Sequence, residues 1–318
     1  MKIGKNVFVT GGAGFIGSHL VDRLIENNNV TVYDNLSSGK KEFLSQHSGK
    51  KNFNFIKGDM LNLEYLKKAM KNQDFVFHLA ANPDIALGTK KTDTDLKQGT
   101  IATYNILESM RINNVKNIGF SSSSAVFGKP KKIPTPENYG PMLPISLYGA
   151  SKLACEGLIT AYSDMFDMNA WIFRFANITG DRGTHGVILD FINKLKKNPN
   201  ELEILGDGKQ RKSYLFVNEC VDGMVFATEK SKNKVNIFNL GCEDWINVDR
   251  IAEIVVEEMK LKNVKFKYTG GSRGWVGDVP LMLLSIEKIK KCGWRPKLNS
   301  EEVVRKTTKL LLKGAGWQ

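Results

Sequence analysis

Cysteine and histidine are scarce in this chain of 318 residues, which has four of each. The cysteines are Cys155, Cys220, Cys242 and Cys292, and the closest two are 22 positions apart, too far for a metal-binding Cys-x-x-Cys pair. The histidines are equally scattered. The sequence therefore excludes a disulfide-stapled scaffold and predicts no metal site.

Long apolar runs are also missing, and none approaches the roughly 20 residues needed to cross a bilayer. Hydrophobic residues make up 42% of the chain and charged residues 25%, which excludes a disordered or collagen-like protein. The first residues, Met1 to Lys5, lead directly into a strand pattern and show no signal-peptide core. We therefore expect a cytoplasmic location.

Acidic residues are outnumbered by 46 basic residues to 33, which gives a net charge of +13. This balance is compatible with nucleic acid, a membrane surface or an anionic small molecule as the partner. A nucleic-acid surface gathers its cations among aromatic residues, whereas these lysines come as dispersed pairs such as Lys40-Lys41 and Lys67-Lys68. We expect no nucleic acid and no membrane as partner, and an anionic small molecule instead.

Short β-rich runs alternate with helical patterns in the first half of the chain. The alternation predicts the α/β class, with a doubly wound parallel-sheet Rossmann fold. After about Asn177, glycine and proline become denser, and we expect a smaller α+β lobe at the C-terminal side. The predicted domains are residues 1–176 and 177–318, and the strand pattern at 235–240 is expected to join the sheet of the first domain.

A glycine-rich turn separates the first predicted strand from the first helix. Gly11 permits a tight turn, Gly14 lets the backbone approach a pyrophosphate, and Gly17 lets the helix pack closely on the strand. Asp34 ends the second strand 17 positions after Gly17, near the spacing of a carboxylate that binds ribose hydroxyls. Because a carboxylate there repels a 2′-phosphate, the pattern predicts NAD rather than NADP as the cofactor.

A serine run, residues 121–124, ends a later strand at the edge where open α/β sheets bind ligands. Tyr148 and Lys152 follow, four residues apart and thus on one helix face. A cationic lysine beside a phenol, with the positive nicotinamide nearby, lowers the tyrosine pKa from about 10. The pair therefore predicts a phenolate that takes a hydroxyl proton as general base.

With these motifs the chain resembles the extended short-chain dehydrogenases/reductases, in the nucleotide-sugar epimerase and dehydratase group, and most of all the UDP-glucose 4-epimerase-like members. The resemblance covers nearly the whole chain, and its further motifs are residues 34–39, 58–59, 78–81, 174–177, 206–217 and 293–296.

The resemblance implies that the first domain binds NAD and the second a nucleotide sugar. It assigns Tyr148 as the base, Lys152 as the residue that lowers its pKa and holds the nicotinamide ribose, and Ser123 as the hydrogen-bond partner of the sugar hydroxyl. The residues that it places at the cofactor are Gly11, Gly14, Phe15, Ile16, Gly17, Asp34, Asn35, Ser37, Gly39, Asp59, Met60, Leu79, Ala80, Ala81, Ser121, Tyr148 and Lys152.

In the second domain the resemblance places Asn177 beside the sugar diphosphate. It also places one cation at the diphosphate, a role for which Arg211 and Lys212 compete. Arg273, in a stretch (272–278) longer than is usual in the family, is assigned as the second cation. A homodimer through the helices at 100–111 and 148–162 is implied as well.

Gly99 departs from the family pattern, because many relatives carry asparagine there, near the nicotinamide. This difference would loosen the positioning of the cofactor or indicate an unusual substrate.

Ala125 discriminates among the reactions of the group. Its dehydratases carry an Asp-Glu pair and its decarboxylases a glutamate at this place, to supply an extra acid and base, and alanine has no carboxylate. We therefore expect 4-epimerisation of a UDP-hexose, through a transient 4-keto-sugar to which retained NADH returns the hydride. The alternatives are an epimerase or reductase of another nucleotide sugar (GDP-, CDP-, UDP-uronate or N-acetyl) and a non-catalytic NAD-sensing regulator. The regulator is expected to lack Tyr148 or Lys152, and both are present.

Overall fold

Nearly continuous apolar strands build the main sheet of this computed structural model, which describes residues 5–274 and 277–314. Val7, Phe8 and Val9 have no exposed surface, as is typical of a parallel sheet that is covered on both faces. The seven strands are β1 (Asn6–Thr10), β2 (Asn29–Asp34), β3 (Phe53–Lys57), β4 (Phe75–His78), β5 (Asn117–Ser123), β6 (Asn169–Phe175) and β11 (Val235–Leu240).

The strand order across this sheet is β11-β6-β5-β4-β1-β2-β3. β1 pairs in parallel with both β2 and β4, so the chain winds outward in one direction from β1 and in the other from β4. The point between β1 and β4 is therefore a topological switch point. Open α/β sheets bind their ligands at the carboxyl ends of such strands.

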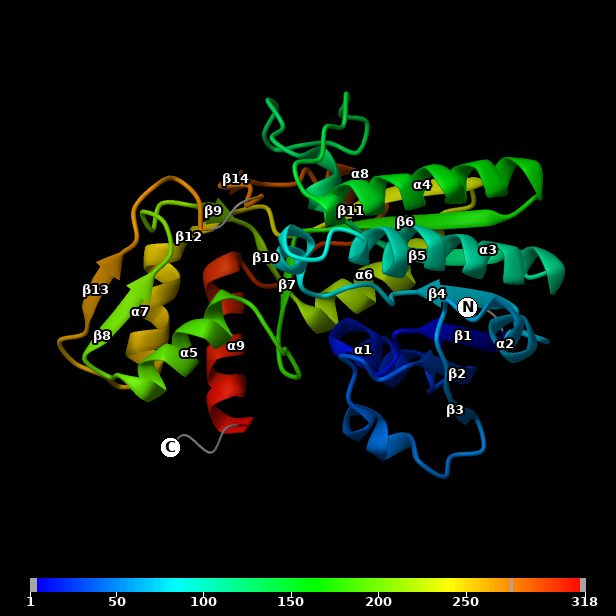
Figure 1. Ribbon diagram of the computed structural model, residues 1–318, viewed down its shortest axis with the longest axis horizontal. Helices are drawn as coiled ribbons and strands as arrows, with labels where there is room; N and C mark the ends of the chain where they lie inside the picture. The colour runs from blue at the N-terminus through cyan, green and yellow to red at the C-terminus, as the bar shows by residue number, and fades with distance from the viewer. Residues whose placement is uncertain (1–4, 275–276, 315–318) are drawn as a thin grey trace. The chain divides into compact units, whose positions relative to one another are not determined.

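The chain divides into two units, coloured along the chain in Figure 1. Unit 1 comprises the residues up to Gly128, Pro141–Arg174 and Val221–Phe238; unit 2 comprises Lys129–Gly140, Phe175–Cys220 and the residues from Asn239 onward.

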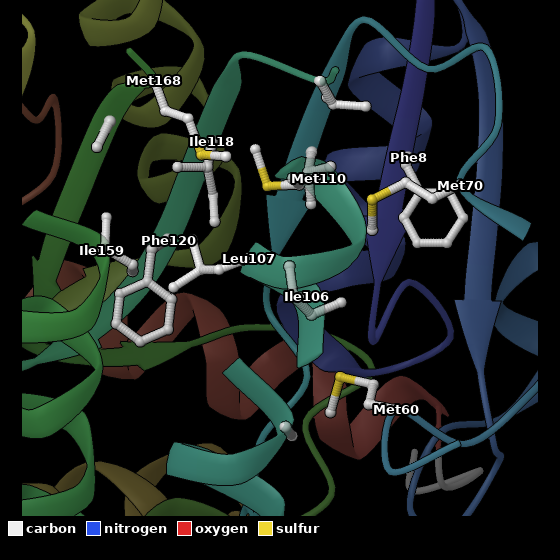
Figure 2. Close-up of a cluster of buried hydrophobic side chains, with 14 of the residues drawn as sticks. Phe8, Met60, Met70, Ile106, Leu107, Met110, Ile118, Phe120, Ile159 and Met168 are labelled. Atoms are coloured by element: carbon white, nitrogen blue, oxygen red, sulfur yellow. The ribbon is translucent and has the colours of Figure 1, made fainter. Parts of the chain in front are cut away.

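Unit 1 surrounds its sheet with helices. They are α1 (Phe15–Leu24), α2 (Leu63–Ala69), α3 (Ala102–Ile112) and α4 (Leu147–Met165), with the short helices η1 (Lys41–His47), η2 (Ile85–Thr89), η3 (Leu96–Ile101) and η4 (Ser124–Phe127). Ile106, Leu107 and Met110 lie on one face of α3, and they share a fully buried cluster with Phe8 and Ile118 of the sheet, shown in Figure 2. This apolar packing fixes α3 on the sheet.

Unit 2 combines small sheets with amphipathic helices. Its strands are β7 (Asn177–Thr179), β8 (Glu201–Ile204), β9 (Arg211–Lys212), β10 (Tyr214–Phe216), β12 (Ile246–Asn247), β13 (Lys265–Tyr268) and β14 (Leu281–Met282). Its helices are α5 (Val187–Lys197), α7 (Val248–Glu258), α8 (Glu287–Lys291) and α9 (Ser300–Gly314), while α6 (Val217–Lys230) continues from unit 2 into unit 1. Buried residues recur on α5 at Ile188, Phe191, Ile192 and Leu195, the spacing of one helix face.

No helix among the described residues is long and apolar enough to cross a membrane. In the same part of the chain, no three His, Cys, Asp or Glu side chains come together in a way that could hold a metal ion.

Candidate active site

The glycine turn brings the start of α1 against the end of β1. Gly11 has a φ of +67°, a conformation that favours glycine, and its N–H donates to Tyr33 C=O at 3.0 Å. A side chain on Gly17 would collide with the Gly11 carbonyl. α1 begins with no side-chain cap and no acidic residue in its first turn, so its first N–H groups are open to an anion.

Asp34 lies at the end of β2, only 8% exposed, with each carboxylate oxygen held by the backbone. Oδ2 accepts from Ala13 N–H at 3.0 Å and Oδ1 accepts from Leu36 N–H at 2.8 Å. Burial raises the pKa of this carboxyl, and the two hydrogen bonds oppose that rise. Each oxygen keeps a free lone pair that could accept a ribose hydroxyl.

The loop after β2 is hydrogen-bonded to the glycine turn. It also approaches the loop after β3. Lys40 N–H donates to Ala13 C=O at 2.9 Å, and a side chain on Gly39 would crowd Ala13. Asn35 Oδ1 accepts from Ser37 N–H at 3.0 Å, and Asn35 Nδ2 lies 3.5 Å from Asp59 Oδ2.

Met60 follows Asp59 and is buried. Its carbonyl accepts from Asn105 Nδ2 at 2.9 Å. Asn105 therefore supports this loop from α3, although no motif in the sequence singled it out.

The segment Leu79–Ala81 follows β4 and lies against the glycine turn. Leu79 N–H donates to Thr10 C=O at 3.2 Å, and a side chain on Gly11 would come within 2.7 Å of Ala80 N. His78, just before it, hydrogen-bonds Thr10 and Thr103, and burial lowers the pKa of its imidazole to about 3, with Lys152 contributing. His78 is thus a neutral packing residue.

These features fit a dinucleotide with unmodified ribose hydroxyls. The glycines leave room for a pyrophosphate at an uncapped helix start, and the Asp34 carboxylate lies at the end of the neighbouring strand. The same carboxylate would repel a 2′-phosphate.

Four of the predicted residues come together at the end of β5 and the start of α4. Ser123 ends β5, and its hydroxyl acts on the phenol of Tyr148 on α4, whose pKa it lowers. Lys152, one helical turn further on and 4% exposed, donates from Nζ to Ser121 C=O at 2.6 Å. Its ammonium group lies 5.7 Å from the centroid of the Tyr148 ring. This places a phenol, a hydroxyl and a cation in one cluster, the set that general-base catalysis on an alcohol requires.

The direction of the Tyr148 pKa differs from the sequence-based expectation. Burial raises the pKa of the phenol to about 12, and the hydrogen bond from Ser123 only partly opposes this. Burial also lowers the pKa of Lys152 to about 8. In the chain by itself, desolvation is therefore the largest cause of the pKa shift of both groups.

Next to this cluster lies a buried ion pair between Glu156 and Arg174. Of the two, only Arg174 belongs to a motif that the sequence indicated. Arg174 Nη2 donates to Glu156 Oε2 at 2.7 Å, and Ser122 Oγ donates to Glu156 Oε1 at 2.5 Å. Glu156 lies one turn after Lys152 on α4. The pair thus ties α4 to β6 and to the serine run.

The structure explains Gly99 by its neighbour. Gly99 lies in η3, a π-helix, and a side chain there would collide with Ser151 Oγ. Ser151 donates to Asp95 C=O at 2.7 Å and shares a hydrogen bond with Thr100 Oγ1 at 3.0 Å. Glycine at this position therefore leaves room for the Ser151 hydroxyl where η3 docks closely on α4.

In unit 2 the predicted substrate residues differ in how they are held. Asn177 Nδ2 donates to Ser213 C=O at 3.1 Å at the start of β7. Arg211 is exposed on β9, with its guanidinium 5.7 Å from the Trp245 ring centroid. Lys212, next to it, forms an ion pair of 2.5 Å with the buried Asp278.

Arg273 is exposed, and Gly274 N–H donates to Asp278 Oδ2 at 3.1 Å. The Trp275 and Val276 of the predicted 272–278 stretch lie outside the described residues.

Comparisons with known proteins agree with this geometry. The family model described as "NAD dependent epimerase/dehydratase family" matches residues 7–241. A crystal structure of UDP-galactose 4-epimerase is 40% identical, with 97% of this chain and 99% of that chain covered and a TM-score of 0.87. UDP-glucose 4-epimerase of Thermotoga maritima, solved with UDP-glucose, is 33% identical over 98% of this chain and 99% of its own, at 0.87. UDP-N-acetylglucosamine 4-epimerase of Methanobrevibacter ruminantium M1, in complex with UDP-N-acetylmuramic acid, is 32% identical over 99% and 100%, also at 0.87.

The chain belongs to the NAD-dependent epimerase/dehydratase family. The predictions of a doubly wound parallel-sheet fold, of NAD as the cofactor and of an NAD-dependent nucleotide-sugar epimerase are confirmed.

Proposed function

We propose that the chain interconverts UDP-hexoses of the UDP-glucose/UDP-galactose type by inverting carbon 4 through a transient 4-keto-sugar. The observation that carries this proposal is the cluster of Ser123, Tyr148 and Lys152 at the end of β5. Three similar proteins whose names specify UDP-sugars support the choice of nucleotide.

Tyr148 removes the proton of the 4-hydroxyl as the C4–H bond breaks. Ser123, whose hydroxyl lowers the pKa of the phenol, holds the same sugar oxygen. Lys152 supplies a positive charge that favours the phenolate, and its Nζ has two N–H donors besides the one on Ser121 C=O for a ribose hydroxyl. The glycine turn, Asp34 and Lys152 would hold NAD, which would supply the acceptor for the hydride of carbon 4 and, once reduced, its donor to the opposite face of the ketone. In that return step Tyr148 gives the proton back to the oxygen.

Ala125 supports epimerisation over elimination. It follows Ser123 by two residues, and its N–H donates to Ser123 Oγ at 3.2 Å. Its methyl group can neither give nor take a proton, so this strand end supplies no second acid–base pair for loss of water.

Arg211 is the cation of unit 2 that we assign to the diphosphate, and Asn177 and Arg273 complete the substrate set. Lys212 is already paired with Asp278 at 2.5 Å, whereas Arg211 is exposed and can offer its planar fork to phosphate oxygens.

The test is incubation of the purified protein with UDP-glucose, UDP-galactose and their N-acetyl and uronic forms, followed by NMR of the sugar. We expect inversion at carbon 4 without added NAD, and NAD that stays with the protein through gel filtration. Tyr148→Phe is expected to lower the rate by about 10²–10⁴-fold. Tyr162→Phe, on the same helix but bonded to Glu108, is the matched control and should keep the rate. Absence of conversion of every UDP-hexose would disprove the substrate assignment.

A further inference from the structure

Ser122 is a buried member of the serine run that the proposed mechanism does not use. Only 2% of it is exposed, and its Oγ donates to Glu156 Oε1 at 2.5 Å. A buried hydroxyl must find a hydrogen-bond partner, whereas an apolar side chain in the same strand would need none. The presence of a hydroxyl bonded to a carboxylate therefore requires an explanation.

The carboxylate that accepts from Ser122 is itself firmly held. Glu156 Oε1 also accepts from Arg174 Nε at 3.0 Å, and Oε2 accepts from Arg174 Nη2 at 2.7 Å. Two such parallel hydrogen bonds fix the orientation of a carboxylate. Both side chains of the pair are buried. Glu156 thus offers Ser122 an acceptor at a fixed place.

The same ion pair contacts the chain on the other side of Ser123. The Arg174 guanidinium lies 4.8 Å from the centroid of the Phe127 ring, and Phe127 is buried at the end of η4. Ser123 lies between Ser122 and Phe127 and caps η4, where its Oγ accepts from Ala125 N–H. Contacts on both sides of Ser123 therefore fix the stretch of chain that carries its hydroxyl.

The helix that carries the acceptor also carries the proposed catalytic groups. Tyr148, Lys152 and Glu156 follow one another at intervals of four residues on α4, about one turn each. Lys152 Nζ donates to the carbonyl of Ser121, which directly precedes Ser122. The end of β5 is thus bonded to α4 at two successive turns, once through the backbone of the serine run and once through a side chain.

η4 also lies close to the start of α4. A side chain on Gly149, the residue after Tyr148, would come within 2.6 Å of the Ala125 carbonyl oxygen. A shift of the strand end along α4 would therefore move Ser123 relative to Tyr148.

We propose that Ser122 is a positioning residue. Its hydrogen bond to Glu156 keeps the end of β5 in place against α4, and with it the Ser123 hydroxyl at Tyr148. The bond thus contributes to the rate of the chemical step and not to the affinity for substrate. The inference rests on the proposed function, because Ser123 and Tyr148 are the groups that Ser122 positions.

The test is the steady-state kinetics of Ser122→Ala with the UDP-hexose that the protein converts. The variant removes one hydroxyl and leaves the hydrogen bonds between Glu156 and Arg174 in place. We expect kcat to fall about ten- to a hundredfold and KM to change less than about twofold, since a small displacement of a catalytic group slows the chemical step. A purely structural role would lower the unfolding temperature and leave kcat unchanged at a temperature where the chain is fully folded.

Ser163→Ala is the matched control. Ser163 lies on the same helix, has no exposed surface and donates to Ile159 C=O at 2.8 Å. This variant also loses a buried hydroxyl and its hydrogen bond, but one that does not reach β5, so its kcat should not change. If Ser122→Ala does not fold, Ser122→Cys fills a similar space with a weaker donor and carries the same expectation.

A fall in kcat for Ser122→Ala, at nearly constant KM and with kcat kept in Ser163→Ala, supports the inference. A loss of stability without a fall in kcat, a rise in KM alone, or an equal fall in kcat for Ser163→Ala overturns it. If Tyr148→Phe keeps full activity, the proposed function fails. If Tyr148→Phe is inactive while Ser122→Ala keeps its kcat, only the role of Ser122 fails.

Discussion

The candidate site residues of unit 1 and those of unit 2 are held in different ways. In unit 1, Lys152 is buried and donates to the backbone of β5, and a buried ion pair between Glu156 and Arg174 stands behind it. In unit 2, Arg211 and Arg273 are exposed, and β9, which carries Arg211, is only two residues long.

This difference indicates how each set of residues can work. Buried contacts on regular elements fix the proposed catalytic groups of unit 1 before any ligand is present, as acid–base catalysis requires. Exposed arginines can rotate onto a diphosphate, and they can do so at little cost to the stability of the free chain.

Loss of the buried pair should have the largest effect on stability. Glu156→Gln removes the carboxylate that pairs with the buried Arg174 guanidinium, and we expect the free energy of unfolding to fall by about 3–5 kcal/mol. Denaturation by urea measures this. The counterpart in unit 2 is Arg250→Gln, which breaks a partly exposed network with Glu253, Glu257 and Glu301 and should cost about 1 kcal/mol. Equal losses in the two variants would remove the distinction between the units.

Lys152→Met should make the protein inactive and also more stable near neutral pH. In the folded chain the pKa of Lys152 is lowered to about 8, from an ordinary value of 10.5. The unfolded state therefore binds more protons between these two values, and the stability of the unmodified chain rises with pH across that window. The methionine variant has no ammonium group to desolvate. Its free energy of unfolding, relative to that of the unmodified chain, should therefore be about 3 kcal/mol higher below pH 8 than above pH 10.5.

Thermal unfolding at pH 7 and at pH 10.5 measures the difference between the two chains. An advantage of Lys152→Met that does not change with pH would contradict the assigned cause, which is desolvation of the ammonium group.

The sequence predicts unit 1 better than unit 2 for a physical reason. Gly11, Gly17 and Asp34 lie at fixed offsets within one strand–turn–helix unit, and Tyr148 and Lys152 lie one turn apart on a helix, so local spacing determines their geometry. Gly99 shows what local spacing cannot predict, namely a contact with a residue far along the chain. Gly99 suggested a loosened cofactor pocket or an unusual substrate, but the structure explains it by the docking of Ser151, 52 positions later in the chain.

The competition between Arg211 and Lys212 could not be decided from spacing either. The partner that occupies Lys212 is Asp278, which lies 66 positions away. The raised pKa of Tyr148 could not be predicted from spacing either, because no local motif shows how strongly the phenol is desolvated.

Gly99→Ala should destabilise the docking of η3 on α4. The added methyl would meet Ser151 Oγ, and overpacking of this kind costs about 1–3 kcal/mol. In Gly99→Ala/Ser151→Ala the obstructing hydroxyl is absent, so the double variant should lose less than the sum of the two single variants. Gly157→Ala is the control on α4: nothing lies within 4 Å of its added methyl, and alanine there should be neutral or slightly stabilising. Additive losses in the double variant would show that the contact does not limit position 99.

Arg211→Gln should give the smallest change in stability. It tests whether the exposed arginine of unit 2 serves to bind the diphosphate. An exposed arginine contributes little to the folded chain, so the unfolding free energy should stay within about 0.5 kcal/mol. Loss of a charge-assisted hydrogen bond to the diphosphate should raise KM about tenfold and leave kcat nearly unchanged, because that contact is equal in the ground and transition states.

Lys212→Gln provides the contrast at the neighbouring position. It leaves the buried Asp278 carboxylate without its cation and should lower stability more than it raises KM. If Lys212→Gln instead raised KM at unchanged stability while Arg211→Gln changed neither quantity, the diphosphate cation would be Lys212. The ion pair with Asp278 would then have to open for substrate, and unit 2 would have a preformed binding group of the kind that unit 1 has in Lys152.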